Sequence, residues 1–208
     1  MLLPIEILED VALSCPKNTH YIAKTLDLFL ASKIERLLDD NSIDDISSTG
    51  NIYAIHTLYW WKSSGLYKPY TNKAIDKASG NGQVHILEWW KNSGLTLLYT
   101  SNALTFASSY GKVSSLEWWK NSGLPLKYYY FSMDSASENG HVSVLEWWKN
   151  SGLELRYTAH SMDWAKNVSV LEWWKNSGLE LRYTVSSIDC ASQNGNVGIL
   201  EWWKNSRL

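Results

Sequence analysis

A nine-residue segment, LEWWKNSGL, recurs along the chain and constrains its fold more than any other feature. Unchanged copies stand at 87–95, 116–124, 145–153 and 171–179, and variants of it at 58–66 and 200–208. The first tryptophan of each copy stands at 60, 89, 118, 147, 173 or 202, so the period is 29 residues with one step of 26. A unit this short cannot bury its own apolar face, and stacking on neighbouring copies solves that problem.

The second half of the unit that starts at Phe131 reads as a short helix. Val144, Leu145 and Trp148 fall on one helical face, which we expect to be core. Gly152 follows the last polar turn and is expected to end the helix in the left-handed region. We place the first tryptophan of each pair on the flank of the stripe, in contact with the same helix of an adjacent unit.

The sequence also predicts the structure of the connector and of the first helix of the unit. Residues 153–157 alternate apolar and polar, which predicts an extended connector with one buried side. Thr158, like its equivalents in other units, is expected to cap the helix that follows. In the first helix, Met133, Ala136 and Ser137 face the core, and an Asn-Gly pair then turns the chain. The prediction is an all-α solenoid of stacked helix-turn-helix units.

Residues 132–155 resemble an ankyrin repeat. Ala136-Ser137, Gly140-His141, Val144-Leu145 and 152–155 occupy the places of its Ala-Ala, Gly-His, apolar helix and Gly-Ala-Asp-Val. The resemblance covers 44–208 and implies about six ankyrin-like repeats. The period of 29 is shorter than the ankyrin period of about 33 because the connector lacks most of the protruding hairpin. The Thr-Pro-Leu-His motif is absent.

Two units are irregular. The fifth lacks three residues, including its Asn-Gly turn, so its first helix is expected either to be shorter or to continue irregularly. Three residues are nearly one helical turn, and the framework can absorb their loss by removing a turn. The first unit has three extra residues between Gly50 and Trp60, which predicts a longer second helix.

Residues 1–43 lack the repeat, and the spacing of their apolar residues predicts a separate helical segment. The start resembles an F-box, which implies contact with a ubiquitin-ligase adaptor. The residues that carry this resemblance are Leu3, Pro4, Glu6, Ile7 and Leu8. The alternative is a helical cap over the open end of the stack.

The tryptophan pairs are themselves candidates for function. Exposed rings could stack on sugars or bases. A nucleic-acid groove would also need interleaved basic residues, whereas one Lys follows each pair and the net charge is -2. We therefore expect core packing for the second tryptophan and an inter-unit contact for the first, with carbohydrate binding by rows of tryptophan as the alternative.

Three positions of the first helix differ from unit to unit while framework positions repeat almost verbatim. They share one helical face, opposite the core residues, and we expect this face to bind a protein partner. Aromatic residues on it are typical of protein-binding surfaces. The alternative is drift of an unselected surface. The candidates are Lys73, Lys77, Asn102, Phe106, Phe131, Ser135, Glu138, His160, Trp164, Ser186, Cys190 and Gln193.

Signals for chemistry are lacking in the sequence. The five histidines do not stand at ligand spacing from cysteines or carboxylates, and no nucleophile or phosphate-loop motif occurs. We expect a non-catalytic protein without metal or cofactor. Cys15 and Cys190 lack disulfide spacing, the start lacks a signal-peptide pattern, and no apolar run suggests a membrane span. These features favour the cytoplasm or nucleus.

Overall fold

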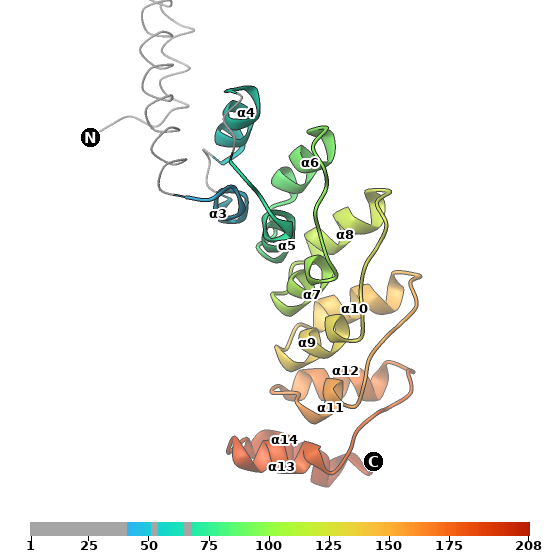
Figure 1. Ribbon diagram of the computed structural model, residues 1–208. Coiled ribbons are helices and arrows are strands. Elements are labelled where there is room, and N and C mark those ends of the chain that lie inside the picture. The colour runs from blue at the N-terminus through green and yellow to red at the C-terminus, as the bar shows by residue number, and fades with distance from the viewer. Residues whose placement is uncertain (1–40, 51–53, 65–67) are drawn as a thin grey trace, which may run out of the picture.

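The computed structural model describes residues 41–50, 54–64 and 68–208, and these ranges contain helices but no strand. The helices come in pairs along the chain (Figure 1). Their bounds are α3 (Ile43–Thr49), α4 (Ala54–Ser64), α5 (Asn72–Gly80), α6 (Val84–Asn92), α7 (Asn102–Ser109), α8 (Val113–Asn121), α9 (Phe131–Glu138), α10 (Val142–Asn150), α11 (His160–Asp163), α12 (Val168–Asn176), α13 (Ser186–Gln193) and α14 (Val197–Ser206). The predicted all-helical fold is confirmed.

The helices form two rows. Odd-numbered helices α3 to α13 pack on one another in a first-helix row, and even-numbered helices α4 to α14 follow in a second-helix row. Each first helix also packs against the second helix of its own unit. Contacts are more extensive in the first-helix row, where small buried residues such as Ala78, Ala107 and Ala136 allow close approach.

The second tryptophan of each pair lies in the core, as predicted. Trp148 is 1% exposed, and Val144 and Leu145 beside it are fully buried. Its indole Nε1 donates to the hydroxyl of Ser108 in the first helix of the preceding unit, at 3.0 Å. Trp90, Trp119 and Trp174 make the same bond to Ser47, Ser79 and Ser137. Each of these rings therefore ties two units together.

The first tryptophan makes the predicted contact with the adjacent unit. Trp147 Nε1 donates to a carboxylate oxygen of Glu117 on the preceding second helix, at 2.7 Å. Trp118, Trp173 and Trp202 do the same to Glu88, Glu146 and Glu172. The indole N–H, with an Asn side chain one turn on, holds the pKa of three of these carboxyl groups, Glu88, Glu117 and Glu146, below the usual value.

Threonines and aspartates join the units at the start of the first helices. The Thr158 hydroxyl accepts the backbone N–H of His160 at 3.2 Å, as expected of a cap, although α11 begins two residues after Thr158. Thr158 also donates its backbone N–H and hydroxyl to the Asp134 carboxylate, at 2.9 and 2.6 Å. Burial raises the pKa of Asp134, and these hydrogen bonds oppose that shift. Thr71, Thr100 and Thr184 pair likewise with Asp44, Asp76 and Asp163.

The irregular units have the predicted helix lengths. Helix α11 has four residues where α9 has eight, and α4 has 11 where α6 has nine. Gly152 follows α10 with a φ of 75°, so the left-handed helix end is confirmed. The connectors are extended without strand pairing, and Leu153 and Leu155 pack on the core while Glu154 and Arg156 are exposed.

Candidate functional site

The variable face of the first helices points to solvent, as predicted. Six of its candidates are exposed: Lys73, Asn102, Phe131, His160, Trp164 and Gln193. The other six are half-buried: Lys77, Phe106, Ser135, Glu138, Ser186 and Cys190. None of the twelve lies in the core, whereas the opposite side of α5, α7, α9 and α11 is buried. Their role in binding stays a prediction.

Three consecutive first helices each carry a pair of neighbouring rings on this face. At the end of α7, Phe106 and the following Tyr110 stack with centroids 6.1 Å apart and planes 14° apart. At the start of α9, Tyr130 and Phe131 lie 4.3 Å apart. On α11, His160 and Trp164 stack at 5.1 Å and 21°. We call these three the aromatic pairs.

Two members of the aromatic pairs, Tyr110 and Tyr130, are not among the candidates that the sequence pattern predicts. Tyr110 follows the end of α7, and Tyr130 precedes the start of α9, so both lie beside the three variable positions. The sequence does carry a signal for them. Tyr110 stands where other units have the Asn of their Asn-Gly turn, and Tyr129-Tyr130 interrupts the series of capping threonines.

The rings are positioned by the helices but are not covered by them. Gly80 ends α5 beneath the first aromatic pair, since a Cβ atom there would lie 2.7 Å from Phe106 Cβ and 3.3 Å from the Tyr110 ring. Tyr110, Phe131 and Trp164 nevertheless keep 54%, 52% and 45% of their surface exposed. Rings this exposed and this close together are typical of protein-binding surfaces.

Charged residues on this face are partly paired with each other. Lys77 Nζ lies 3.1 Å from an Asp45 carboxylate oxygen, and Lys166 Nζ lies 2.8 Å from Glu138. Both ion pairs are solvent-accessible, so they contribute little to stability. The aromatic pairs thus stand between a charged end at α3 and α5 and an end at α13 with Ser186, Cys190 and Gln193.

The tryptophan pairs of the five second helices from α6 to α14 are largely enclosed. In α6, α8, α10, α12 and α14 both members of each pair are buried or half-buried, and their planes meet nearly at right angles. The first tryptophans of the last four pairs already donate their N–H groups to glutamates. Carbohydrate binding by rows of tryptophan stays an untested alternative.

Groups suited to metal binding do not gather in the described ranges. No cluster of three or more His, Cys, Asp or Glu able to hold a metal ion occurs there. His141 Nε2 instead lies 3.0 Å from the carbonyl oxygen of Ser109, one unit back. Asp76, Asp134 and Asp163 are likewise engaged in joining units.

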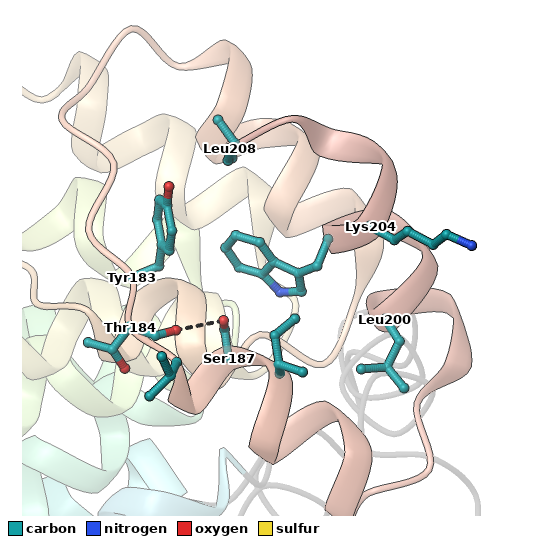
Figure 2. A pocket seen from close by; sticks show the side chains of 9 residues that line it. Tyr183, Thr184, Ser187, Leu200, Lys204 and Leu208 are labelled. Carbon is teal, nitrogen blue, oxygen red and sulfur yellow. Dashed lines mark hydrogen bonds between the residues drawn. The ribbon is translucent and has the colours of Figure 1, made fainter.

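A hollow of about 680 Å³ lies beside α13 and α14 (Figure 2). Tyr183, Thr184, Ser187, Leu200, Lys204 and Leu208 line it. Its floor includes Ile188, which is 42% exposed, although the equivalent Met162 and Met133 are each 1% exposed beneath the next unit. This hollow is therefore the framework surface that other units cover by stacking.

No protein-family model matches the chain, and no curated protein matches it. The F-box-like residues Leu3, Pro4, Glu6, Ile7 and Leu8 lie outside the described residues. Among the helices of the described part, none is both long and apolar enough to span a membrane.

Proposed function

We propose that the chain is an ankyrin-like repeat solenoid that binds a protein partner through the exposed face of its first helices and catalyses no reaction. The observation that carries this proposal is the set of aromatic pairs on α7, α9 and α11. We place the protein in the cytoplasm or nucleus, because its cysteine usage fits a reducing compartment.

The contrast between the two sides of each first helix supports the proposal. Buried positions hold alanine, serine or a medium apolar residue in every unit, because stacking demands close approach. Exposed positions have no such demand, yet three adjacent units place large rings there. Aromatic anchors dominate the energy of many protein interfaces, whereas exposed rings contribute little to the stability of a free chain.

Affinity capture with matched variants tests the proposal. One variant carries Phe106→Ala, Phe131→Ala and Trp164→Ala, and the control carries Lys91→Ala, Lys120→Ala and Lys149→Ala on the second helices, where all three are exposed. Circular dichroism establishes that both are folded. We expect proteins captured by the native chain and the control to be lost from the aromatic variant.

The partner is then purified and titrated against each chain by calorimetry. Loss of hot-spot rings should weaken binding by at least about tenfold, since each costs more than about 1 kcal/mol. Equal affinity for the native chain and the aromatic variant would refute the proposed binding face.

The start motif at Leu3 and Pro4 favours one extension of this function, which we propose only from the sequence resemblance. If the protein is an F-box-type substrate adaptor, a purified ubiquitin-ligase adaptor should bind the full chain but not its Leu3→Ala, Pro4→Ala variant. Absence of binding to either chain would leave residues 1–43 as a cap.

A further inference from the structure

A hollow of about 220 Å³ opens between α11 and α13 on the face that carries the aromatic pairs. Ala165 and Ala191 form part of its lining, together with Trp164, Lys166, Cys190 and Gln193. Both alanines are buried, at 8% and 6% exposure, and the Trp164 ring stacks on His160 beside the opening. The hollow is therefore continuous with the third aromatic pair.

The three residues missing from the fifth unit account for the hollow. In the fourth unit the last turn of α9 packs on α11, because the Ser137 hydroxyl donates to the backbone carbonyl of Ser161. In the second unit Ser79 at the end of α5 bonds in the same way to Ala103, at 2.6 Å. Helix α11 ends at Asp163, so no such turn packs on α13.

The absence of this turn also affects the hydrogen bonding of the core. In four units the second tryptophan donates its indole N–H to the serine of the preceding first helix. Trp203 would need a serine from the fifth unit, and the deletion removed that serine. Trp203 is 9% exposed, and its Nε1 has no hydrogen-bond partner among the described residues. Neighbouring side chains have not replaced the lost turn.

The walls of the hollow are nevertheless held in place. The carbonyl oxygen of Lys166 accepts the side-chain amide of Asn196 at 2.9 Å, and the ammonium group of Lys166 pairs with Glu138. On the other wall the side-chain amide of Asn194 donates to the carbonyl oxygen of Cys190 at 2.8 Å. An apolar floor with a fixed polar rim is the form of a hot-spot pocket.

We propose that this hollow is the anchor pocket of the binding face and that it receives one aromatic side chain of the protein partner. The inference rests on the proposed function. It gives the three-residue deletion a role in binding the partner. A cavity of about 150 Å³ takes up a benzene ring, so the volume here suits a phenyl or indole group. Trp164 at the wall offers such a ring an aromatic neighbour.

Disulfide trapping at Cys190 tests the pocket without the partner. The full chain is used with Cys15→Ser, which leaves Cys190 as its sole cysteine. Two disulfide fragments with the same linker, one ending in phenyl and one in cyclohexyl, compete for the thiol in the presence of mercaptoethanol, and mass spectrometry measures the two adducts. We expect the phenyl adduct to exceed the cyclohexyl adduct by about threefold to tenfold, the range of aromatic pair energies.

Two variants fill the pocket and serve as controls. Insertion of Ser-Glu-Asn after Ala165 restores the 29-residue period and supplies a serine to Trp203, so this variant should melt at a higher temperature than the native chain. Ala165→Leu fills the floor of the pocket. It is the variant used for the test if the insertion variant does not fold. In a folded filled chain the phenyl preference should fall to one, and the affinity for the captured partner should fall by at least about tenfold.

The outcomes separate this inference from the proposed function. Equal phenyl and cyclohexyl adducts on the native chain, or a preference retained after filling, would overturn the anchor pocket. Neither result changes the outcome of the capture assay. That assay tests the binding face by the alanine substitutions of Phe106, Phe131 and Trp164 alone. A phenyl preference that is abolished by filling supports the pocket.

Discussion

Replacement of Ser137 by alanine tests whether the serine-to-tryptophan bonds between units stabilise the stack. The Ser137 hydroxyl is fully buried, accepts the Trp174 indole N–H at 2.8 Å and donates to the Ser161 carbonyl. Ser137→Ala leaves the volume nearly unchanged and removes the acceptor. The variant copies at Trp174 the condition that the deletion has produced at Trp203.

A buried donor that loses its acceptor costs about 1–3 kcal/mol. For a chain of this length, each kcal/mol lowers the melting temperature by about 2–4 °C, so we expect a fall of about 2–12 °C. If the orphaned N–H is the cause, Ser137→Ala should cost less than about 1 kcal/mol in a Trp174→Phe background, since that ring has no N–H to satisfy.

Urea unfolding followed by circular dichroism measures both effects, because that signal does not depend on tryptophan number. Ser135→Ala is the matched control: it lies on the same helix, on the variable face, and should change the free energy of unfolding by less than about 0.5 kcal/mol. The reasoning fails if Ser137→Ala and Ser135→Ala are equally stable, or if the cost of Ser137→Ala is the same with phenylalanine at position 174.

Three further predictions concern the framework. Trp148→Ala should cost about 3–5 kcal/mol by cavity formation, and Glu138→Ala less than about 1 kcal/mol because its ion pair is exposed, as thermal melts of both will show. The lowered pKa values mean that the tryptophan–glutamate bonds stabilise the fold above the ordinary glutamate pKa and lose that effect as the pH falls through the folded-state values. In a variant with glutamine at all three positions, the free energy of unfolding should therefore fall less as the pH is lowered. The same fall in the variant and the native chain would contradict this linkage. Gly152→Ala should cost about 1–2 kcal/mol at its φ of 75° even though nothing lies within 4 Å of the added Cβ, and a neutral result would count against the left-handed helix end.

Much of the framework was predictable because it depends on local spacing. The apolar positions Val144, Leu145 and Trp148 recur with helical periodicity, and they are buried. A glycine after a polar turn predicts a helix end, and Gly152 lies at one. The shortened α11 followed from a count of residues.

The partners across the unit boundaries were not predictable in the same way. Glu146 stands off the apolar face that the spacing predicts, yet it accepts the Trp173 indole N–H, 27 residues on. Tyr110 and Tyr130 belong to the aromatic pairs because of where α7 and α9 end and begin, and helix ends are set by capping and packing together.

The sequence by itself therefore determined the period, the helices and the side of each helix that is buried, because a periodic pattern specifies a face locally. Only the tertiary structure decided what meets each face. The three residues missing from the fifth unit show the difference. A shorter helix follows from the sequence, but the unpaired indole N–H of Trp203 in the next unit and the hollow beside Trp164 appear only in the structure. The physical reason is that burial and hydrogen-bond satisfaction depend on groups brought together by stacking, which no local pattern specifies.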